Sequence, residues 1–179
     1  NATGTTYLET RAMDANGNWS SSASFDPSTV RMSIAKDALA QLIDRFDQLG
    51  NVNIQIVDFA SGANESGWFV DDTHGAGNYI DALQAGGGTE YSTALNAVMA
   101  GFAPPAADRT LFYFITDGQP NAGFEATLVQ SNWETFVAGQ GSGANAAISF
   151  GIGIGSASLA AVNPVAYPNT DADTNGQED

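Results

Sequence analysis

The sequence has 179 residues, 43% of them hydrophobic, which is enough for one domain with its own core. With 20 acidic residues against 5 basic ones, the formal net charge is −15, so the surface repels nucleic acid and anionic membranes and attracts divalent cations. There is no cysteine, which excludes thiol catalysis, zinc–thiolate sites and disulfides.

The cellular setting is also constrained by composition. No apolar run approaches the ~18 residues of a membrane-spanning helix, so we expect no direct membrane insertion. An acidic, cysteine-free chain rich in glycine, asparagine, aspartate and threonine suits an extracellular bacterial surface protein, and a cytosolic origin stays open. From its first residues, NATGTTY, we expect the sequence to be a segment of a longer chain.

The first candidate site in chain order is MDANGNWSSSASFDP, residues 13–27. Asp14, Asn16 and Asn18 alternate with small residues, a spacing at which loop side chains can converge on one hard cation. An exposed hydrophilic turn explains the same residues at least as well when they are taken alone. This stretch therefore leaves two alternatives open, a metal loop and a turn.

The longest helix is predicted to follow at once, over residues 26–50. Asp26 suits the N-cap, Pro27 the first helical position, and Gly50 a helix stop. Apolar residues at i, i+4 spacing predict the buried face of this helix. They are Val30, Ile34, Ala38, Leu42 and Phe46.

Three apolar runs further along the chain, at 52–60, 110–116 and 146–154, are typical of strands buried on both faces. Trp68, Phe69 and Val70 predict an edge strand that forms a hairpin with the first of these runs. The remaining helices are predicted at 77–85, 89–102 and 125–139, with one turn at 158–162.

This order of elements predicts an α/β fold: a doubly wound, mostly parallel sheet with one antiparallel edge strand and helices on both faces. We expect residues 1–179 to form a single domain, with an atypical first strand and loop at 1–25 and a polar acidic tail at 169–179. Such sheets bind ligands at the carboxyl ends of their strands, so functional residues are expected there.

Two residues meet this expectation. Asp117 follows a predicted buried strand, and Gly118 permits a sharp turn that would direct the carboxylate into the crevice above the sheet; a turn or cap aspartate is the alternative. Thr89 follows three glycines and opens a predicted helix. Its hydroxyl could cap that helix, the better interpretation in isolation, or bind a hard cation. A phosphate loop is excluded here because no lysine follows the glycines.

The tail TDADTNGQED contains the first half of a calcium loop. Asp171, Asp173 and Asn175 precede Gly176, and Asp179 takes the ninth position. The sequence stops before a twelfth-position glutamate, so a second calcium site and a solvated tail remain equal alternatives.

Several motifs together resemble the von Willebrand factor A domain. GGGTEYSTAL (86–95) is similar to that family's metal-site threonine loop, and LFYFITDGQPNAG (111–123) to its aspartate loop. NVNIQIVDFAS (51–61) resembles its second strand. The resemblance covers about 26–168, and LAAVNPVAY (159–167) with the polar tail is similar to A domains of bacterial RTX adhesins, including biofilm adhesins.

The resemblance implies a metal-ion-dependent adhesion site, in which oxygen ligands from three loops hold Mg²⁺, Mn²⁺ or Ca²⁺. It assigns Thr89 and Asp117 to the second and third loops. In the first loop, asparagines at 16 and 18 replace the family's serines after Asp14. The preceding TTYLETRAM contains Glu9 and Arg11, whereas the family has an apolar central strand; if LETRAM takes the place of the motif, the site is abolished.

The resemblance implies binding rather than catalysis. We expect an extracellular bacterial adhesin module that engages a protein or surface ligand through Ca²⁺ or Mg²⁺, next to further domains of a larger adhesin. One alternative is a spacer domain with a degraded metal site, stiffened by calcium in the tail. Another is a Mg²⁺-dependent phosphohydrolase that uses Asp117. The sequence offers no second strand-end aspartate and no basic phosphate clamp for this chemistry.

Overall fold

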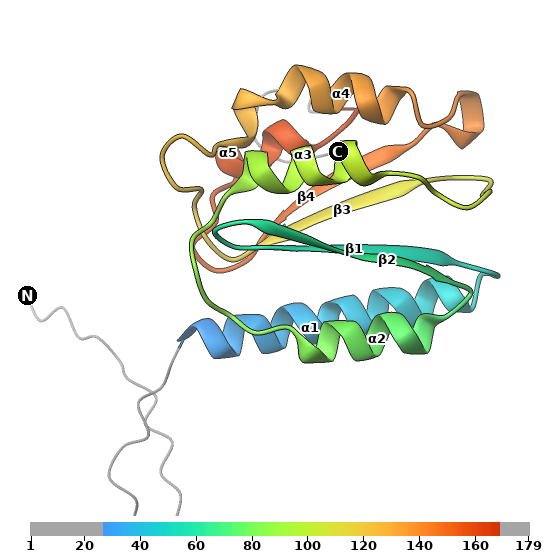
Figure 1. Ribbon diagram of the computed structural model, residues 1–179, viewed down its shortest axis with the longest axis horizontal. Coiled ribbons are helices and arrows are strands. Elements are labelled where there is room, and N and C mark those ends of the chain that lie inside the picture. The colour runs from blue at the N-terminus through green and yellow to red at the C-terminus, as the bar shows by residue number, and fades with distance from the viewer. Residues whose placement is uncertain (1–26, 169–179) are drawn as a thin grey trace, which may run out of the picture.

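The computed structural model describes residues 27–168. These residues form three layers, in which the strands lie between two groups of helices (Figure 1). One group consists of α1 and α2, and the other of α3, α4 and α5. The helices are α1 (Pro27–Asp47), α2 (Thr73–Ala82), α3 (Tyr91–Gly101), α4 (Gln130–Ala138) and α5 (Leu159–Val162), and the strands are β1 (Asn53–Phe59), β2 (Ala63–Val70), β3 (Leu111–Thr116) and β4 (Ile148–Gly153).

The strands pair as two ladders. β1 runs antiparallel to β2, from Asn53 opposite Val70 to Phe59 opposite Ala63, which confirms the predicted hairpin. β3 runs parallel to β4, with Leu111 opposite Ile148. Within residues 27–168, no ladder joins β1 to β3, so the described part is an α/β arrangement of two two-stranded sheets rather than one continuous doubly wound sheet. The first strand expected at 1–25 lies outside the described residues.

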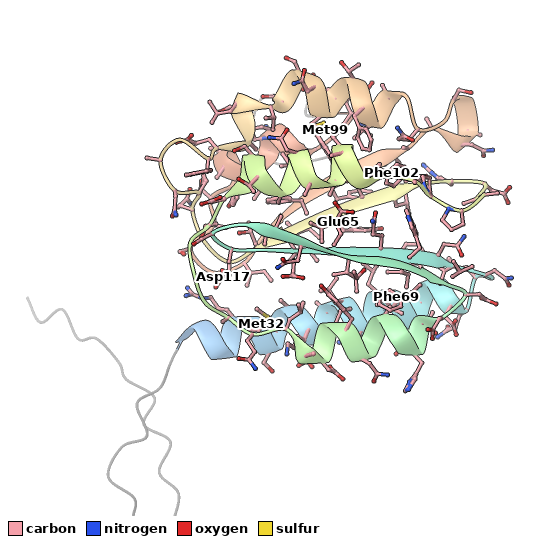
Figure 2. All side chains as sticks on the ribbon, in the orientation of Figure 1. Met32, Glu65, Phe69, Met99, Phe102 and Asp117 are labelled. Carbon is pink, nitrogen blue, oxygen red and sulfur yellow. The ribbon has the colours of Figure 1, made fainter. Side chains whose placement is uncertain are left out.

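Two hydrophobic clusters hold these layers together. The larger cluster lies among α3, β3, α4 and α5, with Ala147 just before β4, and includes the fully buried side chains of Tyr91, Leu95 and Val137. The smaller cluster consists of Ile43, Ala76 and Ile80, with partly buried residues of β1 and β2 packed against it. Figure 2 shows the same division, with Phe69 directed to the α1–α2 side and Met99 and Phe102 on the opposite side of the strands.

Aromatic side chains link the two sheets. Phe59, at the end of β1, stacks on Phe114 of β3 with ring centroids 5.1 Å apart. Both rings also pack edge-on against Tyr91 of α3, at 6.2 and 4.9 Å. α3 therefore covers β1 and β2 while it contributes to the larger cluster, and so connects the two halves of the molecule.

The predicted buried face of α1 is wrong in part. Ile34 is 51% exposed and Ala38 is also exposed, whereas Leu39 and Ile43 pack into the smaller cluster. Leu42 and Phe46 are half-buried. Apolar residues occupy more than one row of this helix, and packing against α2 selects the row with Leu39 and Ile43.

A hydrogen bond between β1 and α2 fixes the hairpin against its helix. The Tyr79 hydroxyl donates to the carboxylate of Asp58, which also accepts from the side-chain amide of Asn64 at 3.1 Å. This bond, together with burial and the charge of Asp58, raises the pKa of Tyr79 to about 12. Tyr79 therefore stays a neutral donor at physiological pH. No helix within residues 27–168 has the length and apolarity needed to cross a lipid bilayer.

The two glycines of α2 predict opposite effects of the same substitution. A Cβ on Gly77 would meet nothing within 4 Å, so Gly77→Ala should raise the free energy of unfolding by about 0.5–1 kcal/mol by favouring the helix. A Cβ on Gly75 would clash with the carboxylate of Asp72, the N-cap, which accepts from the Gly75 amide at 2.8 Å. Gly75→Ala should therefore lower the free energy of unfolding by about 1 kcal/mol.

Urea unfolding followed by circular dichroism measures both variants against the parent protein. Equal shifts of the two midpoints in the same direction would contradict this account of α2.

Candidate functional site

The candidate site lies where several loops meet at the carboxyl ends of β1 and β3. The β1–β2 turn and the glycine loop are joined by a hydrogen bond from the Gly88 amide to Ser61 Oγ (2.7 Å). A second bond runs from the Glu90 amide to the Ala60 carbonyl (3.1 Å). The loop before α3 is therefore attached to the end of β1.

The glycines in this loop are needed for close backbone packing. Gly87 has a positive φ of +82°, and a Cβ on it would lie 2.9 Å from the Cβ of Ala60. A Cβ on Gly88 would lie 2.5 Å from Asn121 Nδ2. The glycine run thus brings the loop against the β1–β2 turn on one side and the loop after β3 on the other.

Thr89 lies between this glycine loop and α3, half-buried. The helix begins two residues later, at Tyr91, with Glu90 in the N-cap position, so the predicted capping role of Thr89 is wrong. The Thr89 carbonyl accepts from the Asn121 amide at 2.8 Å, and its Oγ1 lies 3.4 Å from where a Cβ on Gly118 would be. The structure therefore brings the Thr89 hydroxyl next to the loop that carries Asp117.

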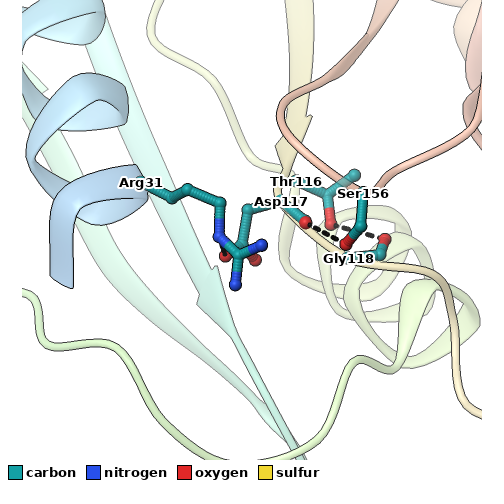
Figure 3. A network of polar contacts seen from close by, with 5 residues as sticks. All are labelled: Arg31, Thr116, Asp117, Gly118 and Ser156. Atoms are coloured by element: carbon teal, nitrogen blue, oxygen red, sulfur yellow. Dashed lines mark hydrogen bonds and ion pairs between the residues drawn. The ribbon is translucent and has the colours of Figure 1, made fainter. Parts of the chain in front are cut away.

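Asp117 is the first residue after β3, as predicted. Its carboxylate is 46% exposed and forms an ion pair with Arg31 of α1, in which Arg31 Nε lies 3.0 Å from Asp117 Oδ2 (Figure 3). Its carbonyl accepts from Ser156 Oγ at 3.0 Å. The backbone of Asp117 is thus held by the loop after β4, while its side chain points toward α1.

Gln119 is a positioning residue that the sequence did not indicate. Its Nε2 donates to the Ser156 carbonyl at 2.8 Å, and its Oε1 accepts from Ser158 Oγ at 3.2 Å. These bonds tie the loop after β3 to the loop after β4 across a separation of 37 or more residues. No local pattern could have identified partners so far apart in the chain.

Tyr91 of α3 holds the loop after β3, which carries Asp117. Its side chain is fully buried, and its hydroxyl donates to the Gly118 carbonyl. Burial raises the pKa of Tyr91, the nearby Asp117 charge raises it further, and a hydrogen bond with Thr116 lowers it. Tyr91 is therefore a neutral donor that fixes the backbone next to Asp117.

The donor atoms at this edge suit a hard cation only in part. The Thr89 hydroxyl and the Asp117 carboxylate supply oxygen ligands of the kind that Mg²⁺ and Ca²⁺ prefer. Among residues 27–168, however, no three acidic or histidine side chains gather in a way that could hold a metal ion. The Asp117 carboxylate is also paired with Arg31. A cation at this site would have to displace that guanidinium.

The other predicted ligands lie outside the described residues. They are Asp14, Asn16 and Asn18 of the first loop and Asp171, Asp173 and Asn175 of the tail.

Solved structures share this fold. Proximal thread matrix protein 1 (PTMP1) from the mussel byssus matches 76% of this chain and 36% of its own, with 20% identity and a TM-score of 0.58. A form of it with a zinc-occupied MIDAS motif matches 76% of this chain at 19% identity and a TM-score of 0.57. The conserved hypothetical protein BatB from Bacteroides thetaiotaomicron matches 70% of this chain and 56% of its own, with 19% identity and a TM-score of 0.51.

These matches span about a third of the mussel protein and about half of BatB, and at such identities they show the fold alone. No curated protein matches the sequence. The sequence profile of the von Willebrand factor type A domain matches residues 16–119, more than half of the chain. That stretch includes both Thr89 and Asp117. The chain belongs to the von Willebrand factor type A domain family.

Proposed function

We propose that this domain is a binding module that engages a protein or surface ligand through a divalent cation, Ca²⁺ or Mg²⁺. The observation that carries this proposal is the junction of two loops from distant parts of the chain. The Thr89 loop and the Asp117 loop are bonded through Asn121, and Gly118 packs beside the Thr89 hydroxyl. This contact supports a site in which Thr89 and Asp117 both supply oxygen ligands, at the edge where α/β folds commonly bind their ligands.

The proposed ligand set combines Thr89 and Asp117 with Asp14, Asn16 and Asn18 of the first loop. Asparagine carbonyl oxygens bind calcium in other loops, so the two substitutions for serine are compatible with a hard cation. With a net charge of −15, the protein needs a local positive charge to hold an acidic ligand group. A bound divalent ion supplies that charge.

The proposed setting is the bacterial cell surface, as part of a larger RTX-type adhesin in cell adhesion or biofilm formation. The acidic, cysteine-free composition and the tail after LAAVNPVAY support it. The solved mussel thread protein, a matrix protein of this fold with a zinc-occupied MIDAS motif, supports only the extracellular, metal-binding part of this setting. The partners would be a protein or surface ligand and the neighbouring domains of the same adhesin.

We also propose that residues 1–179 form one domain in which the first strand, expected at 1–25, completes a doubly wound sheet. The start of α1 supports this, because Arg31 lies at the carboxyl edge next to Asp117. A chain segment that leads into α1 from that edge can run parallel to β3, as strands do in βαβ units.

Titration calorimetry with Mg²⁺ and Ca²⁺ tests the proposed function. The double variant Thr89→Ala, Asp117→Ala should bind the ion at least ~100-fold more weakly, since losing direct ligands exceeds the loss of their supporting contacts. Asp108→Ala, an exposed acidic residue just before the opposite end of β3, is the matched control and should bind normally. Unchanged binding by the double variant would refute the adhesion site.

The Arg31–Asp117 ion pair favours a second candidate function. In this alternative the domain is a spacer whose edge site no longer binds metal, stiffened by calcium at Asp171, Asp173 and Asn175. Calcium binding that survives the double variant but is lost in Asp171→Ala, Asp173→Ala would support the spacer and contradict the adhesion site.

A further inference from the structure

The protein's own Arg31 occupies the position next to Asp117 that a bound cation would take. It lies near the start of α1, and its Nε is 3.0 Å from Asp117 Oδ2. Its side chain is 32% exposed, so the pair is partly shielded from water. Figure 3 shows the guanidinium directed across the space between α1 and the end of β3.

The path of the Arg31 side chain depends on a glycine in the loop after β4. Gly155 has a φ of +66°, and a Cβ on it would lie 2.7 Å from Arg31 Cδ. The stem of Arg31 therefore lies across a position where only glycine leaves room. Packing of this kind directs the guanidinium toward Asp117.

The ion pair is held by charge rather than by a well-formed hydrogen bond. Arg31 Nε is buried and has no hydrogen-bond partner among the described residues, although it lies within ion-pair distance of the carboxylate. A buried donor without a good acceptor is a cost to stability. Such a pair can be replaced when a stronger cation competes for the same carboxylate.

We propose that Arg31 is a tethered cation that competes with the divalent ion for Asp117 and thereby lowers the metal affinity of the site. This inference rests on the proposed function of the same edge. Guanidinium keeps its charge at all physiological pH values and offers no lone pair to a metal. It therefore repels a divalent ion bound beside it, and the ion binds only when Arg31 turns away.

The competition also couples the site to α1. Arg31 belongs to the helix whose Ile43 packs in the smaller cluster, whereas Asp117 follows β3, whose Phe114 lies in the larger one. When the ion displaces Arg31, the link between the two halves at this edge is released. The position of α1 and the occupancy of the site are then linked, so each shifts the other.

Magnesium titration of the whole chain by calorimetry tests this inference. Arg31→Met keeps an apolar stem but removes the charge, and it should bind Mg²⁺ about tenfold more tightly than the parent protein. Lys36→Met is the matched control, because Lys36 is another cation of α1 that donates to the Asp81 carbonyl at 2.7 Å. It should stay within about twofold of the parent.

A second variant and a second readout separate competition from a structural role. Arg31→Lys keeps the charge and should keep the weak affinity. Thermal unfolding with and without Mg²⁺ should show a larger magnesium-induced rise in Tm for Arg31→Met than for the parent protein. A substitution that only damages packing would lower the Tm in both conditions and would not tighten metal binding.

The outcomes distinguish the two proposals. If the parent and Arg31→Met bind Mg²⁺ equally, or if Arg31→Met binds more weakly, the competition is refuted and the adhesion site stands. If Arg31→Met binds Mg²⁺ measurably and the parent protein does not, the competition is supported and explains why the parent protein shows no binding. If none of the proteins binds Mg²⁺ or Ca²⁺ at the edge, both proposals are refuted.

Discussion

Replacing Trp133 with alanine is expected to lower the free energy of unfolding by about 3–5 kcal/mol. Trp133 lies in α4, is only 2% exposed, and packs edge-on against Phe112 of β3 at 5.3 Å and beside Phe136 at 5.5 Å. Truncation leaves a cavity between helix and strand that the neighbouring rings cannot fill. Chemical denaturation followed by circular dichroism measures the loss.

Trp133→Phe separates the ring from its hydrogen bonds. The indole Nε1 donates to the Val165 carbonyl at 2.8 Å and to Ser149 Oγ at 3.2 Å, both in a buried environment. Phenylalanine keeps most of the ring contacts but leaves the Val165 carbonyl without this donor, so about 1–3 kcal/mol should be lost. If Trp133→Ala cost no more than Trp133→Phe, the cavity argument would be wrong.

Gly151→Ala is the second substitution with a large expected cost, about 1–3 kcal/mol. Gly151 lies in β4, and a Cβ there would lie 2.5 Å from the Val162 carbonyl oxygen of α5 and 3.2 Å from Val162 Cβ. The carbonyl belongs to the backbone of a helix and cannot rotate away as a side chain could. α5 would have to move off β4, which would draw its own buried Val162 side chain, and with it the neighbouring Val165, out of the larger cluster.

The control for this substitution is Gly62→Ala in the β1–β2 turn, where a Cβ would meet nothing within 4 Å. Its free energy of unfolding should stay within about 0.5 kcal/mol of the parent protein. Urea denaturation gives both values under the same conditions. Equal stabilities of the two variants would show that α5 yields to the extra methyl group at no cost.

Local sequence patterns predicted the helices and strands well where a few neighbouring residues determine where an element begins or ends. Pro27 starts α1 in both the prediction and the structure, and the apolar run 110–116 becomes β3 with Asp117 directly after it. Caps, turns and runs of apolar residues act over a few positions, so they can be identified without knowing the rest of the fold.

The predictions were wrong where distant contacts decide. Packing against α2 and β1 decides which row of α1 is buried. Ile34 therefore stays exposed, whereas Leu39 packs against the smaller cluster. Thr89 matches the N-cap pattern, but the Glu90 amide donates to the Ala60 carbonyl and the Asn121 amide to the Thr89 carbonyl, so the helix begins only at Tyr91. Such bonds join segments that no local pattern relates.

The same limit applies to the candidate site. Thr89 and Asp117 were proposed from their own loops, and the structure brings those loops together. Arg31 lies within the predicted helix 26–50, and nothing in its sequence neighbourhood indicates that it pairs with Asp117, more than 80 positions away. Gln119 and Ser156 were missed for the same reason.

The unequal size of the two hydrophobic clusters has a consequence for local opening. In the described part of the chain, the smaller cluster has three buried members, Ile43, Ala76 and Ile80, against ten in the larger one. Local unfolding starts where few apolar contacts are buried, so α1 and α2 should fluctuate open more often than α4 and β4. Each opening separates Arg31 from Asp117, so under the proposed competition the opening rate of α1 sets how often that carboxylate is available to bind an ion.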